Sequence, residues 1–211
     1  MRATRSGVVT VLALALLVPG VGAVAQSPSP EATPLYAPDD LATTLPTTVG
    51  DYEVRIVTGA LPPTYREVYR DMLLPFGRTP DDVLVADGMG YPTGDEDALD
   101  RDGPSFDLWA MRVEGIPAAA LVEPWVFGAF AASDAFDESL WQMGWRDIGG
   151  HDVYAATPIP KWWDEAVARE GANPEFGWYL LAKGEVMFIV SLPVSHAVSS
   201  PTLVELLAEL P

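Results

Sequence analysis

Residues 178–192 have the sequence WYLLAKGEVMFIVSL, which predicts a β-hairpin. Two largely apolar runs flank Lys183-Gly184, a dipeptide that favours a tight turn between antiparallel strands. The second arm is apolar at every position from 186 to 190, whereas a strand with one face in water alternates apolar and polar residues. We therefore expect this arm to be a central strand of a sheet, covered on both faces.

The rest of the chain predicts an α+β domain. Strands are expected at residues 51–58, 106–114, 145–148 and 151–156, and helices at residues 64–74, 117–130, 133–141, 160–170 and 201–210. Pro124 is expected to kink the helix at 117–130 or divide it into two pieces. These elements follow one another without regular alternation. We therefore expect an antiparallel sheet of about five to seven strands, covered by helices on at least one face.

A short helix is also expected to begin near residue 79. The segment Thr79-Pro80-Asp81-Asp82 combines a capping residue, a proline suited to the first helical position and two acids suited to the first turn. Asp87-Gly88 and Gly90 then interrupt the pattern. Glycine is unfavourable inside a helix, so we expect this helix to end before them.

The first 25 residues predict a secretory signal peptide. Arg2 and Arg5 precede an apolar run from Val8 to Val18, and Ala23-Val24-Ala25 places small residues at a cleavage site. The run is shorter than the roughly 20 apolar residues that a membrane-spanning helix needs. We expect cleavage, a secreted or extracytoplasmic protein at the bacterial cell surface, and no transmembrane segment in the mature chain.

Residues 26–44 favour a Pro-rich disordered linker. Prolines recur there among Ser, Thr and Ala, a composition that favours extended, poorly packed chain. A single globular α+β domain is then expected over residues 45–211. Its size is sufficient for a hydrophobic core of its own.

The charge and the missing cysteines exclude several classes of function. The chain has 30 acidic and 12 basic residues, so its formal net charge is -18, and removal of the two signal-peptide arginines makes it -20. This charge opposes binding to nucleic acids and to anionic lipids. Without cysteine, the chain forms no disulfide, thiolate metal site or cysteine nucleophile.

Tryptophans are candidate ligand-binding residues. The pairs Trp141 with Trp145 and Trp162 with Trp163 are close enough in sequence to form aromatic surfaces that stack on sugar rings. Large rings also fill the core of a domain that has no disulfides. The sequence leaves both interpretations open.

An acid-rich stretch at residues 95–103 is a candidate calcium site. Asp95, Asp97, Asp100 and Asp102 supply carboxylates, and weak extracellular calcium sites are built from such groups. Aligned with the EF-hand pattern, the stretch lacks the first carboxylate and the closing Glu. A solvated acidic loop is the alternative to weak Ca²⁺ binding.

Catalytic motifs are not evident in the sequence. His151 and His196 are the only histidines, and they do not have the spacing of a known metal motif. The chain also lacks the G-x-S-x-G motif of serine hydrolases. We therefore expect no catalytic residues and, apart from weak Ca²⁺, no cofactor.

Several short motifs lie at the predicted turns and caps. They are Leu45-Pro46 with Val49-Gly50, residues 77–82, residues 112–115, residues 149–154 and the hairpin and helix that end at Leu210-Pro211. Together they resemble an uncharacterised group of exported bacterial proteins. The resemblance spans most of the mature chain and implies an exported location and this architecture, with no activity attached.

These observations favour an exported, non-catalytic domain that binds a small ligand or a partner protein. One alternative is a carbohydrate-binding or carbohydrate-active protein that uses exposed tryptophans. A second alternative is a weak calcium-binding extracellular domain.

Overall fold

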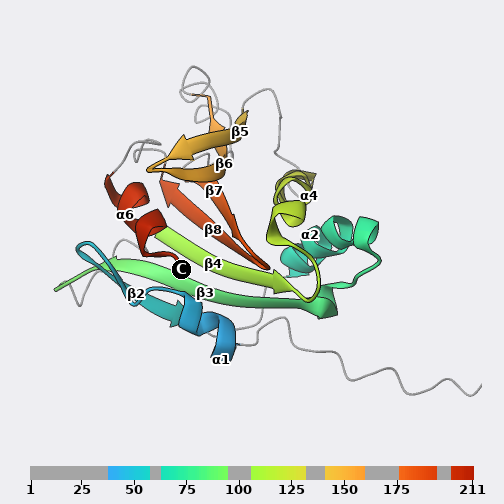
Figure 1. Cartoon of the computed structure of the whole chain (residues 1–211), viewed down its shortest axis with the longest axis horizontal. Coiled ribbons are helices and arrows are strands. Elements are labelled where there is room, and N and C mark those ends of the chain that lie inside the picture. Colours follow the sequence, from blue (N-terminus) through green and yellow to red (C-terminus); the bar gives the residue numbers. More distant parts are fainter. Residues whose placement is uncertain (1–37, 58–62, 95–105, 132–140, 160–175, 194–200) are drawn as a thin grey trace, which may run out of the picture. The chain divides into compact units, whose positions relative to one another are not determined.

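The computed structural model describes residues 38–57, 63–94, 106–131, 141–159, 176–193 and 201–211. These residues form an antiparallel sheet of eight strands, in the order β1-β2-β3-β4-β8-β7-β6-β5 (Figure 1). The strands are β1 (Thr48–Val49), β2 (Tyr52–Val57), β3 (Val83–Pro92), β4 (Phe106–Val113), β5 (Trp141–Ile148), β6 (His151–Pro158), β7 (Phe176–Lys183) and β8 (Val186–Pro193). The expected antiparallel sheet is confirmed, but the expected number of strands was too low because β1 and β3 were not predicted.

Helices cover both faces of this sheet. They are α1 (Pro38–Leu41), α2 (Pro63–Leu73), α4 (Ala118–Ala131) and α6 (Pro201–Glu209), with 3₁₀ turns η1 (Ala42–Thr44), η2 (Leu74–Phe76) and η3 (Pro80–Asp82). The helices α2 and α6 lie where the apolar periodicity predicts them, and α4 lies where a helix is expected at residues 117–130. Pro124 lies inside α4, which is one continuous helix and not two pieces. No helix among the described residues is both long enough and apolar enough to cross a membrane.

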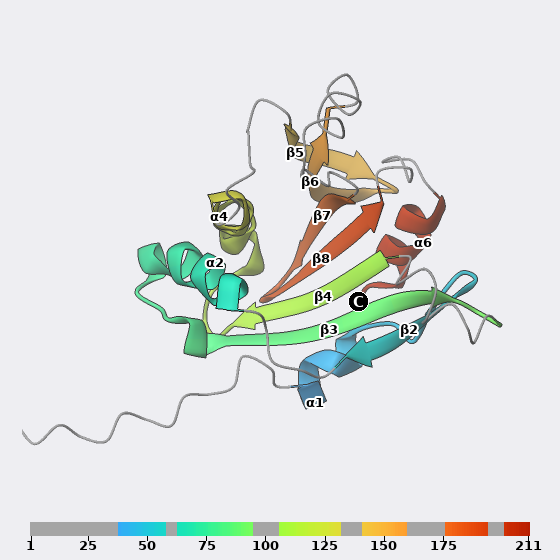
Figure 2. The ribbon, with the colours of Figure 1, turned by 180° about the vertical axis from the view of Figure 1, so that it is seen from behind.

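Each face of the sheet has its own hydrophobic core. Side chains of α2 and α4 pack on one face, called here the α2/α4 face. Side chains of α1 and α6 pack on the other, called here the α1/α6 face, where Leu203, Leu206 and Leu207 of α6 are buried. Figure 2 shows α2 and α4 side by side at one end of β4 and β8, with α6 near the other end. The covered position predicted for β8 is therefore confirmed, since its residues contribute to both cores.

The helix expected from residue 79 is a single 3₁₀ turn, η3, and strand β3 follows it. The capping interaction is present, because the backbone N–H of Thr79 donates to a carboxylate oxygen of Asp82 at 2.8 Å. Gly90 does not interrupt the strand. A side chain there would overlap the ring of Phe106 on β4, so glycine lets the ring lie against the backbone.

The hairpin of β5 and β6 forms around the predicted turn. Gly149 and Gly150 have φ angles of +62° and +85°, a conformation that glycine adopts without strain. Strand β5 begins at Trp141, so Trp141 belongs to the sheet and not to the helix expected at residues 133–141. The remaining part of that expected helix and the one at 160–170 lie outside the described residues.

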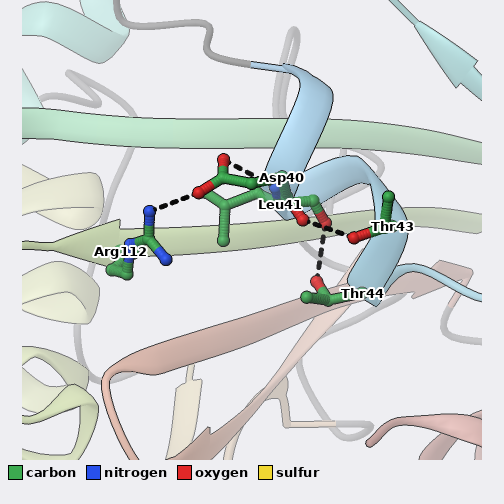
Figure 3. A network of polar contacts seen from close by, with 5 residues as sticks. All are labelled: Asp40, Leu41, Thr43, Thr44 and Arg112. Carbon is green, nitrogen blue, oxygen red and sulfur yellow. Dashed lines mark hydrogen bonds and ion pairs between the residues drawn. The ribbon is translucent and has the colours of Figure 1, made fainter.

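The described chain begins with α1, which an ion pair links to the sheet (Figure 3). Arg112 on β4 donates to a carboxylate oxygen of Asp40 at 2.6 Å. The hydroxyls of Thr43 and Thr44 donate to main-chain carbonyls of Asp40 and Leu41. Leu41 is only 1% exposed, so the packed part of the chain already includes residues before 45, the expected start of the domain.

Candidate functional site

Two carboxyl groups interrupt the apolar α2/α4 face. On β3, side chains alternate between the two faces, so Asp87 follows Val83 and Val85 on this face. On β4, the same alternation places Asp107 in line with Trp109 and Met111. Asp87 is 8% exposed and Asp107 is half-buried.

Strand register places the two aspartates on adjacent strands, one register position apart on the same face. Asp87 lies opposite Trp109, and Asp107 lies opposite Met89. The two aspartates are therefore diagonal neighbours on adjacent antiparallel strands, a relation in which α-carbons lie about 7–8 Å apart and side chains reach each other. On the other side of Asp107, β8 contributes Ser191, which is also buried.

Helix α2 brings a tyrosine to the same place. The ring of Tyr65 meets the ring of Trp109 edge to face, with the centroids 6.1 Å apart. Burial, together with the negative charges of Asp107 and Asp87, raises the pKa of the Tyr65 hydroxyl. These four residues, Tyr65, Asp87, Asp107 and Trp109, are called here the acidic–aromatic site.

Burial changes the chemistry of Asp107. Loss of hydration raises the pKa of its carboxyl from 3.8 to about 6, because the charged form is disfavoured away from water. Arg55 on β2 is two strands away on the same face and pairs with Glu53 at 3.4 Å. Asp107 therefore changes its charge near neutral pH, whereas an ordinary aspartate is ionised there.

A row of aromatic rings continues from this site across the α2/α4 face. Trp178 on β7 lies opposite Ser191, and its ring meets that of Trp125 on α4 edge to face at 5.4 Å. Trp141 stacks on Trp178 with a centroid separation of 6.0 Å. The row thus links α4 with the edge strand β5.

Of the predicted tryptophans, the structure places Trp141 and Trp145 on this face, and each has its own ring partner. Trp145 meets Tyr154 edge to face at 5.5 Å and is 48% exposed, whereas Trp141 is partly buried against Trp178. Trp141 thus contributes to the core, while much of the Trp145 ring is accessible to a ligand.

The other predicted site residues lie outside the described residues. They are Trp162 and Trp163, and the acids Asp95, Asp97, Asp100 and Asp102. Their proposed roles in sugar stacking and calcium binding therefore stay predictions. Within the described ranges, no group of three or more acidic or histidine side chains is arranged to hold a metal ion.

One buried polar atom of the aromatic row has no partner among the described residues. The indole N–H of Trp125 donates no hydrogen bond there, although the side chain is only 2% exposed. An unpaired buried donor costs about 1–3 kcal/mol relative to one that is hydrogen-bonded. The α2/α4 face therefore carries an energetic cost that its apolar packing has to offset.

Sequence reasoning missed the acidic–aromatic site. Asp87 was interpreted as part of a helix-breaking segment, so its burial in a strand was not expected. Asp107 lay in a predicted strand, and alternation with Trp109 and Met111 was the signal that could have placed it on a covered face. What the sequence could not supply was the pairing of β3 with β4, which brings the two acids together.

Comparison with known proteins adds no assignment to this geometry. No family model, curated protein or solved structure matches the chain.

Proposed function

We propose that the protein is an exported, non-catalytic domain that binds a small ligand at the acidic–aromatic site. The observation that carries this proposal is the pair of carboxyl groups, Asp87 and Asp107, on a face whose buried residues are otherwise apolar apart from Ser191. Carboxylates accept hydrogen bonds and attract cations, and the adjacent rings of Tyr65 and Trp109 stack on flat groups. A matching ligand has a ring or another apolar body and at least one donor, either an amine or a hydroxyl.

A small ligand fits this site better than a protein surface does. Asp87 is almost fully buried, and Tyr65, Asp107 and Trp109 are half-buried, so little of these polar groups is exposed. A polar group of this kind is reached by a small molecule, whereas protein partners mostly use exposed side chains at flat surfaces. Export rests on the signal-peptide features of residues 1–25 and is part of the same proposal.

The proposal is tested with two probes of matched shape, benzylamine and benzyl alcohol. Binding is measured by titration calorimetry and by the rise in melting temperature. We expect at least one probe to bind, and Asp107→Asn to weaken benzylamine binding about tenfold or more, because a hydrogen bond to a charged group contributes roughly 1.5–3 kcal/mol. Preference for the amine or for the alcohol identifies the donor that the site selects.

Asp147→Asn is the matched control, since Asp147 is an exposed aspartate on β5. It should leave both affinities unchanged. The proposal fails if neither probe binds at millimolar concentration, or if Asp107→Asn and Asp147→Asn weaken binding equally.

A carbohydrate-active protein is the second candidate function. The specific observation in its favour is that paired carboxyl groups lie among aromatic rings, an arrangement that glycoside hydrolases use for acid and base roles. The raised pKa of Asp107 suits a proton donor near neutral pH. Release of reducing sugar from soluble oligosaccharides, abolished by both Asp87→Asn and Asp107→Asn, would replace the binding proposal with this one.

A further inference from the structure

The two edges of the sheet differ in length. β1 has two residues, and so short an edge strand offers little main chain to another protein. β5 is the other edge (Figure 1) and has eight residues, with β6 as its one neighbour among the described strands. It contains neither proline nor lysine, residues that protect an edge from further pairing. β5 is therefore the edge at which the sheet can be extended.

The hairpin register defines which main-chain groups of β5 face outward. Ile148 and His151 flank the two-residue turn Gly149-Gly150, so they exchange hydrogen bonds, and every second pair along the hairpin does the same. The β5 residues between these pairs direct their N–H and C=O groups away from β6. These residues, called here the outward row of β5, are Trp141, Met143, Trp145 and Asp147.

The acidic end of the outward row attracts a positive charge. Asp147 lies directly opposite Asp152 of β6, and both side chains are exposed. Like charges in this position repel each other, and none of the ion pairs among the described residues includes either aspartate. A basic residue opposite Asp147 on an added strand would relieve this repulsion. Further along the row, Trp145 is 48% exposed and offers an apolar contact on the same face.

The opposite side of β5 has a different charge. Arg146 alternates with the residues of the outward row, so it points to the other face, as Ile148 does in the α1/α6 core. An acidic residue on an added strand would therefore suit the position opposite Arg146. Space is open beside the middle of the strand, because a side chain at Gly144 would meet no described atom within 4 Å.

We propose that β5 binds an extended segment of a partner protein, which joins the sheet as a further antiparallel strand. The segment has a basic residue opposite Asp147 and apolar residues opposite Trp145 and Met143. Main-chain hydrogen bonds to the outward row supply affinity, and the alternate side chains supply specificity. This inference goes beyond the small-ligand binding proposed for the acidic–aromatic site and does not depend on it.

A second copy of this chain fits the edge less well than a basic segment does. Directly opposite residues of antiparallel strands lie on the same face, so Asp147 would face a residue from the outward row of the copy. None of those residues is basic. The formal net charge of -18 also opposes self-association.

The probe for this inference is the peptide acetyl-Lys-Glu-Val-Thr-Val-Thr-Val-amide. In antiparallel alignment it places Lys opposite Asp147, Glu opposite Arg146, and its first two valines opposite Trp145 and Met143. Binding of the fluorescently labelled peptide is measured by anisotropy. A peptide with its first two residues exchanged should bind about 3-fold to 10-fold more weakly, because each exposed cross-strand charge pair contributes modestly.

N-methylation of the peptide separates strand addition from nonspecific adhesion. Methyl groups on the amides of its third and fifth residues face β5 and remove two hydrogen bonds, so affinity should fall about 10-fold or more. Methyl groups on the fourth and sixth amides face away and should leave affinity nearly unchanged. NMR hydrogen exchange on the complex should show slower exchange at Met143, Trp145 and Asp147, and little change at Arg146, which already pairs with β6.

Two charge-reversal variants complete the test. Asp147→Lys should reverse the preference between the two unmethylated peptides. Asp51→Lys, in the exposed turn between β1 and β2, makes the same change in net charge and should keep the wild-type preference. β8, β7 and β6 separate β5 from β4, which carries Asp107, so failure here leaves the small-ligand proposal standing.

The inference is overturned if the peptide does not bind at millimolar concentration or if both N-methylated peptides bind equally well. It is also overturned if Asp147→Lys keeps the wild-type preference. The N-methylated peptides use the wild-type protein, so they decide the matter even if Asp147→Lys does not fold. Dimerisation without peptide, abolished by Trp145→Pro in a folded protein, would identify a second copy as the partner and overturn the choice of a basic segment.

Discussion

The two faces of the sheet differ in the polarity of their buried side chains. On the α1/α6 face, leucines of α6 lie on aromatic and aliphatic side chains of β4 and β8, and the described core there is apolar. On the α2/α4 face the core is also covered by helices, yet it includes Asp87 and Ser191, the two buried polar residues of the described chain. It also includes the indole N–H of Trp125, which has no hydrogen-bond partner among the described residues. Burial of a polar group costs free energy unless the group is hydrogen-bonded, so a face that keeps such groups is the better candidate for function.

The largest expected effect tests the structural role of the α1/α6 face. Leu206 is fully buried in α6, and Leu206→Ala removes apolar contact and leaves a cavity. The free energy of unfolding should fall by about 2–5 kcal/mol, and the melting temperature by about 2–4 °C per kcal/mol. Thermal and urea unfolding followed by circular dichroism measure both.

Leu74→Ala is the control for this variant, because Leu74 is 67% exposed. It should change the free energy of unfolding by less than about 0.5 kcal/mol. If Leu206→Ala is as mild as Leu74→Ala, then α6 does not hold the core as described. If Leu206→Ala stays folded but abolishes ligand binding, the α1/α6 face also takes part in binding. The two faces would then not differ in function.

A smaller effect is expected at the accessible edge of the α2/α4 face. Trp145→Ala removes the contact with Tyr154 and the buried half of the Trp145 ring. The free energy of unfolding should therefore fall by about 1 kcal/mol. Trp145→Phe keeps a ring at this position and should recover most of it. Phe127→Ala on α4, where the side chain is 51% exposed, serves as the control and should change stability less. A loss in Trp145→Ala as large as in Leu206→Ala would show that the ring is structural and not available to a ligand.

Elements whose sequence determines them locally were predicted correctly. The stripes of α2 and α6 and the glycine turn of β5 and β6 depend on residues a few positions apart. Strand β3 depends on distant contacts, because side chains far away in the sequence pack on its glycines: Phe106 lies on Gly90, and Val54 and Leu45 lie on Gly88. The same dependence explains why β3, one of the two strands that were not predicted, was missed.

The residues of the candidate site also differ in how far the sequence alone predicts them. Trp145 is conspicuous in the sequence as a tryptophan and is exposed in the structure, but it lies outside the acidic–aromatic site and its role in ligand binding stays a prediction. Asp87 and Asp107 are two of 30 acidic residues, and nothing in their local sequence marks them as a pair. Their proximity requires the register of β3 and β4, and the shift in the pKa of Asp107 requires the cover that α2 and α4 provide.

The smallest expected effect is that of replacing the indole of Trp125. It tests directly whether the α2/α4 face contains an unsatisfied polar group that the α1/α6 face lacks. Trp125→Phe removes apolar volume from a core, which destabilises a protein, but it also removes an N–H that has no described partner, which stabilises it. Because the two contributions oppose each other, the free energy of unfolding should change by less than about 1 kcal/mol. Phe106→Leu on the α1/α6 face removes volume without relieving any polar group, so it should cost more, roughly 1–2 kcal/mol. Chemical unfolding of both variants decides between them: a loss in Trp125→Phe that equals or exceeds the loss in Phe106→Leu would mean that the indole N–H is satisfied in solution. The α2/α4 face would then contain one unsatisfied buried polar group fewer than its geometry indicates.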